Sequence, residues 1–398
     1  MTVTGNALTT ATYHDTLTDI GAGTDRRDVS EMLDLWAHKE TPFLNKLSWG
    51  AETGGMSIEW ISEHLGFGYI VALSIATSAT ASLAIDSGGM GTAALALEQV
   101  TSGTLLFHYN STLSTYALLS VSEVPGGGVT VAYDIVAYST SAEVEIAVGE
   151  KMYILGDVAN EGSGPKKDKS RTRATLSNKL MILRKDIQIT GSMAATDFHA
   201  VEDELRHQIQ MRLKEMQRDR EMTILLATAV AQSATVAGVM NGVFGFLIGQ
   251  AANTEVVNTS VGLTETGVND MVAALYENNS TPNCLVLPTT QARKFTTWDR
   301  DKIRTTPDAR LAGHFVTKYL TDVGVEIEII MMRQFPVNLG FVLDSDKIHP
   351  RAKKGRKLFI EKLGLDGDRT RYQILSEFSL EMRGYDQGQH GMWTSLTG

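Results

Sequence analysis

The chain has 398 residues, a formal net charge of −10 and 43% hydrophobic residues. This length favours two or three domains, and the hydrophobic content argues against intrinsic disorder. The acidic balance argues against a dedicated nucleic-acid-binding protein. No run of about 18 apolar residues predicts a membrane span, and Met1–Thr16 lacks the features of a signal peptide. The single cysteine, Cys284, excludes an intramolecular disulfide framework.

The negative charge is concentrated in one part of the chain. Between Lys46 and Lys151 there is no lysine or arginine, but there are ten Asp and Glu residues, as many as the net charge of the whole protein. The rest of the chain is therefore balanced. A stretch with its own composition, rich in Val, Ala, Thr, Ser and Gly, predicts a module inserted into a host domain of a different kind.

The N-terminal region predicts an arm followed by a short helix. Residues 1–30 are Thr- and Gly-rich without a consistent apolar period, and Val29–His38 is weakly amphipathic. Pro42 is expected to break the chain. Phe43 and Leu44 beside it are expected to be exposed apolar side chains that bind another surface.

The acidic stretch predicts a small β-barrel or sandwich. Gly54–Leu65 alternates as a strand does, and the module is expected to begin near Gly66. Glycine, proline and asparagine turns separate several short apolar runs. The glycines at 126–128 lack the lysine and following helix of a phosphate-binding loop, so they predict a turn. The strands are expected at Leu73–Thr77, Ala81–Ile85, Thr104–His108, Ala117–Val121, Val129–Tyr138 and Lys151–Leu155.

The segment after the module predicts a return to the host domain. Asn160–Pro165 has the composition of a hinge, and Thr172–Gly191 is expected to form a long pair of strands. The strand before the module and the strands after it are expected to form one long hairpin that carries the module at its tip.

The strongest helix signal covers Asp197–Ala231, with Asp197 as N-cap. At 1.5 Å per residue this helix would be roughly 50 Å long, and we interpret it as a structural spine. Acidic residues cluster in its first turns, where the helix dipole favours them. Its apolar stripe consists of Val201, Leu205, Ile209, Leu213 and Met216.

Helices and strands alternate in the remainder, which predicts a compact α/β region. Two late strands are expected to be joined by a turn at Asp366–Asp368. The predicted helices are Thr264–Tyr276 and Thr289–Trp298, and the predicted strands are Cys284–Pro288, Val323–Ile330, Lys357–Leu363 and Arg371–Arg383.

The sequence offers no catalytic constellation, so we predict no catalytic residues, no cofactor and no metal site. There is no nucleophile elbow, Walker loop or dinucleotide fingerprint in a suitable context, and one cysteine does not build a structural zinc site. Histidines 199 and 207 are expected to be surface or core residues. A metal site is conceivable at Asp344, Asp346 and His349, but Asp-x-Asp is common in polar turns, so a polar turn is the preferred interpretation.

Two basic runs could contact nucleic-acid phosphates. They are Arg351–Lys357 and Lys166–Arg173. Neither contains the aromatic residues that stack on bases. The preferred interpretation is therefore a solvated loop that pairs with carboxylates of a neighbouring subunit, and phosphate contact is the alternative.

Three segments resemble one known family. Leu363–Asp368, Gln373–Arg383 with its Glu-Phe-Ser-Leu-Glu, and Gln389–Gly391 are similar to the end of tailed-phage major capsid proteins. Asn160–Ser163 resembles the exit from an inserted β-domain in one branch of that family. The join from the strand at 189–192 to the helix also resembles the family's pattern.

The resemblance implies an α+β protein with the HK97-like capsid fold plus an inserted small all-β domain on the outer shell surface. The implied parts are an N-terminal arm (1–45), an extended hairpin loop (46–66 and 159–195), the β-domain (67–158), a peripheral domain with the spine helix (196–239 and 351–398) and an axial domain (240–350).

The implied function is that of a structural major capsid protein, not an enzyme. It would assemble in the host cytoplasm into the pentamers and hexamers of an icosahedral virion head around double-stranded DNA. Its partners would be itself and possible scaffolding, portal and decoration proteins, with weak non-specific DNA contact and no membrane. The alternatives are a β-rich surface or fibre adhesin, and an α/β enzyme that uses residues 240–350.

Overall fold

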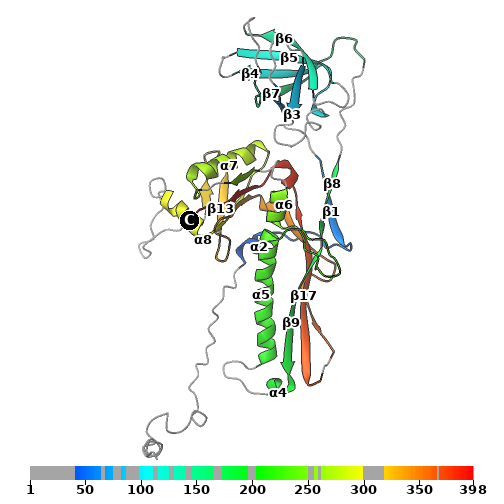
Figure 1. Ribbon diagram of the computed structural model, residues 1–398, viewed down its shortest axis with the longest axis vertical. Coiled ribbons are helices and arrows are strands. Elements are labelled where there is room, and N and C mark those ends of the chain that lie inside the picture. Colours follow the sequence, from blue (N-terminus) through cyan, green and yellow to red (C-terminus); the bar gives the residue numbers. More distant parts are fainter. Residues whose placement is uncertain are drawn as a thin grey trace, which may run out of the picture.

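The protein is elongated, with a body and an extension. The long helix α5 (Glu204–Leu226) runs beside the strands β9 (Met181–Thr190) and β17 (Arg369–Met382), and a separate group of strands lies beyond a two-stranded ladder (Figure 1). This computed structural model describes residues 41–63, 68–74, 82–86, 98–110, 115–124, 130–139, 146–164, 173–195, 203–249, 255–258, 261–298, 318–364 and 367–397. The expected helix Val29–His38 lies outside them.

Helix α5 packs on a four-stranded sheet in which β17 is central. Strand β9 pairs with one edge of β17, and β15 (Ile348–Ala352) and β16 (Phe359–Lys362) share the other edge. The two predicted late strands are therefore confirmed. The described part of the predicted apolar stripe also packs as expected: Leu205, Ile209, Leu213 and Met216 meet Ile187, Ile189 and Ile374.

The spine helix is shorter than predicted. It has 23 residues, about 34 Å at 1.5 Å per residue. Its N-cap is Asp203, whose carboxylate accepts the backbone N–H of Arg206 at 3.1 Å, whereas the predicted cap Asp197 lies outside the described residues. The helix ends at Leu226 because Ala227 is extended. The chain enters α6 (Val243–Gly249) through Gly242, directly against the end of α5. A Cβ on Gly242 would lie 2.6 Å from the carbonyl oxygen of Ile224.

The second sheet is α/β, as predicted. Its strand order is β10-β18-β14-β11-β13-β12. The wholly buried β11 (Cys284–Pro288) and the helices α7 (Glu265–Glu277) and α8 (Thr289–Trp298) confirm the sequence predictions. Strand β13 begins at Glu326 rather than Val323, because Gly324 turns the chain with φ of +85°. The other strands are β10 (Glu255–Asn258), β12 (Lys318–Leu320), β14 (Gly340–Leu343) and β18 (Gly391–Thr394).

Strand β18 corrects one assignment. Its residues were expected in the peripheral part, with 351–398, but they pair with β14 and β10 in the α/β sheet. The physical reason is burial on both faces, because Met392 lies in the main core and Trp393 in the cluster with α7 and α8, each at most 1% exposed. The short elements that complete the body are α4 (Gly191–Ala194) and the 3-10 turns η2 (Ser345–Lys347) and η3 (Tyr385–Gln387).

The extension begins as an antiparallel ladder of β1 (Ser57–Ser62) and β8 (Ala174–Lys179). Six strands between them in sequence form a closed barrel, ordered β2-β3-β6-β5-β4-β7. The five strands predicted from Ala81 to Leu155 overlap β3 to β7. The strand predicted at Leu73–Thr77 does not overlap an observed strand, because β2 ends before it, at Ala72. The bounds are β2 (Tyr69–Ala72), β3 (Ser82–Asp86), β4 (Thr104–Asn110), β5 (Thr115–Glu123), β6 (Thr130–Tyr138) and β7 (Lys151–Asp157).

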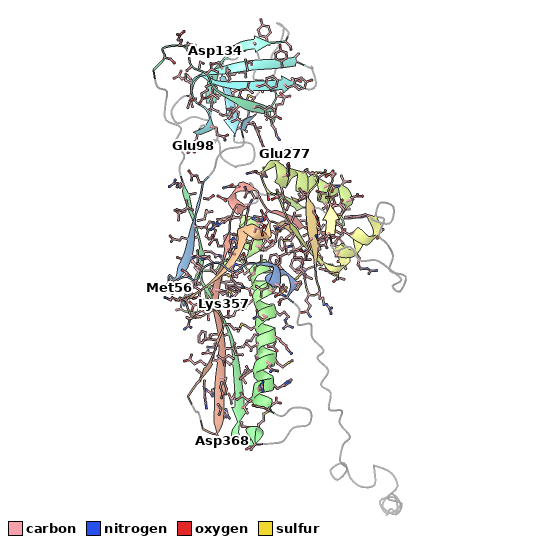
Figure 2. All side chains as sticks on the ribbon, turned by 180° about the vertical axis from the view of Figure 1, so that it is seen from behind. Met56, Glu98, Asp134, Glu277, Lys357 and Asp368 are labelled. Atoms are coloured by element: carbon pink, nitrogen blue, oxygen red, sulfur yellow. The ribbon has the colours of Figure 1, made fainter. Side chains whose placement is uncertain are left out.

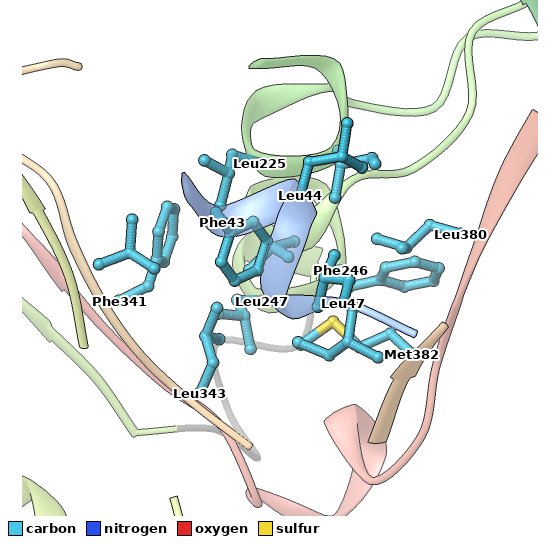
Figure 3. Close-up of a cluster of buried hydrophobic side chains, with 14 of the residues drawn as sticks. Phe43, Leu44, Leu47, Leu225, Phe246, Leu247, Phe341, Leu343, Leu380 and Met382 are labelled. Atoms are coloured by element: carbon cyan, nitrogen blue, oxygen red, sulfur yellow. The ribbon is translucent and has the colours of Figure 1, made fainter. Parts of the chain in front are cut away.

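The segment at Pro42 corrects two expectations. Instead of breaking the chain, proline starts the short helix α2 (Pro42–Lys46), at a position where its missing N–H removes no helical hydrogen bond. Phe43 and Leu44 are buried, at 0% and 6% exposure. Figure 3 shows them among apolar side chains of the main core: Leu225, Phe246, Leu247, Phe341, Leu343, Leu380 and Met382.

Candidate functional site: the junction of hairpin, spine helix and β17

Two glutamates of β17 hold the basic residues around them. Glu377 and Glu381 are 5% and 3% exposed. The carboxylate of Glu377 accepts Arg356 Nε at 2.7 Å and pairs with Lys353 Nζ at 3.3 Å. Buried carboxylates require such partners, because an unpaired charge in the interior is costly.

Glu381 is paired in the same way. One of its oxygens accepts Arg351 Nη1 at 3.0 Å, and the other accepts Arg383 Nε at 2.7 Å. The expectation that the basic run 351–357 pairs with a neighbouring subunit is therefore wrong for these residues, since their carboxylates come from the same chain. Strand pairing is the reason: β15 lies antiparallel to β17 and brings the run alongside both glutamates.

A buried arginine ties the spine helix to the same strand. The guanidinium of Arg220 lies 4.4 Å from the ring centroid of Trp49 and 5.4 Å from that of Phe378, and Lys357 Nζ lies 4.2 Å from Trp49. Burial lowers the pKa of Arg220 to about 10, so it stays charged at neutral pH. Cation–π contacts that are shielded from water are stronger than exposed ones.

The neighbouring Glu221 caps helix α2. Its Oε1 accepts the backbone N–H groups of Phe43 and Leu44 at 2.7 and 3.0 Å. Burial raises the pKa of Glu221, and these two hydrogen bonds oppose that rise. The carboxylate thus satisfies the N–H groups that a helix start leaves unpaired. The segment before the hairpin is fixed to the spine helix by this cap.

The hairpin is rooted in the body by one amide. Asn178 of β8 is 4% exposed, and its Nδ2 donates to the carbonyl oxygens of Asn241 and Leu380 at 2.9 and 2.8 Å. Its Oδ1 accepts the backbone N–H groups of Lys179 and Asn241, each at 2.9 Å. An amide offers two donors and two acceptor sites, so Asn178 uses its full capacity.

The opposite strand adds an aromatic anchor. Trp60 of β1 is 6% exposed, and its ring lies 6.1 Å from Phe246 and 6.4 Å from Tyr385, both edge-on. The hydroxyl of Ser62 donates to Asp386 at 2.8 Å. The ladder therefore leaves the body in a fixed direction.

The C-terminal Gln389-His390-Gly391 is structural. His390 is fully buried, its Nδ1 accepts the backbone N–H of Asp344 at 3.3 Å, and its Nε2 donates to the carbonyl oxygen of Arg383 at 2.9 Å. Burial lowers the pKa of His390 to about 4. The neutral ring bridges the two sheets, and at Gly391 a Cβ would lie 2.5 Å from Met271 Sδ.

We expect His390 to make stability depend on pH. Its pKa in the folded protein lies below the ordinary 6.5, so the unfolded chain binds the proton first and stability falls as pH drops from 6.5 towards 4. The loss is about 3 kcal/mol at 1.36 kcal/mol per pKa unit. Urea titration of unassembled subunits measures the free energy of unfolding of the unsubstituted chain and of His390→Ala. The difference between the two should be largest at neutral pH and should shrink as the pH falls. A difference that stays constant down to pH 4 would contradict this.

The residues considered for chemistry do not converge. The Asp344 carboxylate accepts Asp346 N at 3.1 Å and pairs with Lys347 at 3.4 Å, while His349 Nδ1 lies 3.1 Å from Ser48 Oγ. Among the described residues, no group of three or more His, Cys, Asp or Glu side chains is arranged to hold a metal.

Other predicted residues have structural positions. His207 lies half-buried on α5, whereas His199, Asp366 and most of the run 166–173 lie outside the described residues. Cys284 is buried in β11, and burial raises its pKa to about 12, so the thiol is inert at neutral pH. In the described part of the chain, no helix is both long and apolar enough to cross a membrane.

The spine helix on a long sheet, the α/β sheet and the projecting hairpin together form the HK97-like fold of phage capsid subunits. Over 96% of this chain and 98% of the other, the structure matches one from Mycobacterium phage Bobi with 11% identity and a TM-score of 0.51. A match to one from Mycobacterium phage Adephagia covers 95% and 97%, with 10% identity and a TM-score of 0.50. The capsid of Myoviridae phage XM1 matches over 93% and 97%, with 9% identity and a TM-score of 0.47.

The family model of the SU10 major capsid protein matches residues 3–397, and the chain belongs to this family. It is a structural protein of the phage virion, located in the capsid, as the resemblance predicted. The comparison with curated proteins found no match. In the sequence, Glu377, Glu381 and His390 stand out only as parts of the family motif. It did not find Asn178, Trp60, Arg220 or Glu221, whose partners lie far away in sequence.

Proposed function

We propose that this subunit works by tiling, without catalysis, and that its copies close into the pentamers and hexamers of an icosahedral head around double-stranded DNA. The observation that carries the proposal is the rooted hairpin. Asn178 and Trp60 hold β1 and β8 on the body, so the ladder projects in one direction in every copy. A fixed projection lets the same contact repeat from subunit to subunit, as closed symmetric shells require.

We further propose that residues 67–158 are a domain inserted at the hairpin. Supporting this, the barrel has a core cluster of its own, drawn only from residues between Ile70 and Met152. The ladder of β1 and β8 also has its own pairing, from Ser57↔Lys179 to Ser62↔Ala174. The remaining divisions are the arm (1–45), the hairpin loop (46–66 and 159–195), the peripheral domain (196–239 and 351–398, apart from β18) and the axial domain (240–350).

Charge supports an outward position for the barrel. Residues 47–150 contain no lysine or arginine, so this stretch has no cation with which to bind packaged DNA. Of the five cations in the basic run at 351–357, Arg351, Lys353 and Arg356 are paired with the buried Glu377 and Glu381. Contact with DNA is accordingly weak and non-specific in this proposal, and scaffolding, portal and decoration proteins are its further partners.

Electron microscopy of the purified protein tests the proposal. Closed shells, or rings of five and six subunits, are expected. A chain that remains monomeric at every protein and salt concentration tested would refute it, because tiling is the proposed mechanism.

Removing the barrel should leave assembly intact. We expect a variant in which residues 67–158 are replaced by a short Gly/Ser bridge to fold and to form shells, because the ladder of β1 and β8 and the main core contain no barrel residue. Electron microscopy and sedimentation compare it with the full chain. If the variant yields neither soluble capsomers nor shells, the barrel is integral to the core and the proposed insertion is wrong.

A further inference from the structure

The outer face of β4 is apolar where a soluble barrel usually presents polar side chains. Along this strand, buried positions alternate with the outward positions Leu105, Phe107 and Tyr109. Strands with one face in water normally carry polar residues on that face. A continuous apolar surface that remains exposed marks an interaction site.

Neighbouring strands extend this surface with more rings. Tyr153 of β7 lies opposite Phe107 on one side and Tyr69 of β2 on the other, and Tyr116 of β5 lies opposite Tyr109. The Phe107 and Tyr116 rings are stacked, with centroids 6.4 Å apart. Tyr109, Tyr116 and Tyr153 remain 53%, 45% and 49% exposed. We call these five residues on four adjacent strands the aromatic face.

The stretch that carries most of the aromatic face is acidic, because residues 47–150 contain ten Asp and Glu residues and no lysine or arginine. Asp134 of β6 is exposed. It pairs across the sheet with Ser120 of β5, which in turn pairs with Leu105 of β4. Figure 2 places Asp134 on the barrel. The cation at the edge is Lys151, whose Nζ lies 4.7 Å from the Tyr69 ring centroid and 2.8 Å from Glu277 of α7. An anionic ligand would therefore find little to neutralise it, whereas a cationic partner is complementary.

We propose that the aromatic face binds an arginine-rich segment of another protein on the head surface. This rests on the proposed outward position of the barrel. Exposed rings attract guanidinium groups through cation–π contact, and the acidic stretch that carries most of them adds long-range charge attraction. Lys151 over Tyr69 shows the same chemistry within the chain. Arginine suits the face better than lysine, because its planar group stacks on rings and is more weakly hydrated.

The experiment uses assembled particles of the full chain and two labelled peptides of equal length, one of arginine and glycine and one of lysine and glycine. Fluorescence anisotropy should show tighter binding of the arginine peptide. The double variant Tyr109→Ser/Tyr116→Ser should weaken that binding roughly tenfold, because it removes two cation–π partners without changing the charge. Tyr276→Ser is the matched control, since this tyrosine is 52% exposed on α7, off the barrel, and should leave binding unchanged.

Each other outcome overturns the inference. If both peptides bind equally well and the double variant does not change their binding, the particle attracts cations only through its general negative charge. Competition by a neutral oligosaccharide such as maltohexaose would identify a glycan surface. Particle clustering that the double variant abolishes would make the occupant a second copy of this chain. Shell formation is scored in the same samples, so intact shells of the unsubstituted chain that do not bind the arginine peptide refute only this inference, and absent shells refute the proposed function.

Discussion

Replacing Asn178 by alanine is expected to destabilise the subunit by roughly 3 to 5 kcal/mol. The amide makes four hydrogen bonds, to Asn241, Leu380 and Lys179. Its removal leaves buried backbone groups without partners, and each such group costs about 1 to 3 kcal/mol. The free energy of unfolding of unassembled subunits, obtained by urea titration, measures the loss. We also expect fewer closed shells in electron micrographs, because β8 is no longer held on the body.

Ser177→Ala is the matched control. Ser177 lies next to Asn178 on β8 and is exposed, so the change should alter stability by no more than about 0.5 kcal/mol. If Asn178→Ala and Ser177→Ala have equal effects, the amide does not root the hairpin and the fixed projection loses its main support.

Local patterns predicted the regular elements well. Helix α7 and strand β11 were located closely, because Val268, Met271, Val272 and Leu275 repeat with helical spacing and Cys284–Pro288 is a short apolar run between turn signals. The strands of the barrel were found through the glycine and proline turns between them. Their closure into a barrel depends on long-range pairing, for which the sequence provides no local signal.

The misplaced elements have identifiable causes. Pro42 was expected to break the chain, but Glu221 lies 178 residues away from Phe43 and supplies the cap that makes a helix start there. The sequence favours Asp197 as N-cap because it precedes an apolar period, whereas the helix begins after Asp203, another acceptable cap. Boundary choices between similar capping residues are decided by the surrounding packing.

The junction was missed for the same physical reason. The run 351–357 is basic in isolation, and only the register of β15 against β17 shows that Glu377 and Glu381 pair with three of its five cations. Asn178 and Arg220 resemble ordinary surface residues within their own segments. Their roles arise from partners on other elements, so composition and periodicity do not identify them.

Trp60→Ala is expected to have an effect as large as that of Asn178→Ala, about 3 to 5 kcal/mol. The ring is buried at the base of β1 and packs edge-on against Phe246 and Tyr385. Truncation leaves a cavity between the hairpin and the body, so the ladder loses its fixed direction. Urea titration measures the stability, and electron microscopy should show incomplete or irregular shells. Ile61→Ala is the control, because this neighbour on β1 is 67% exposed.

A second variant separates packing from hydrogen bonding. Trp60 Nε1 is buried and has no hydrogen-bond partner among the described residues. Trp60→Phe therefore removes an unsatisfied donor while it keeps an aromatic ring, and it should cost only about 1 to 2 kcal/mol and preserve closed shells. If Phe is as damaging as Ala, an aromatic ring alone is not sufficient, and the anchor depends on the full volume of the indole between the hairpin and the body.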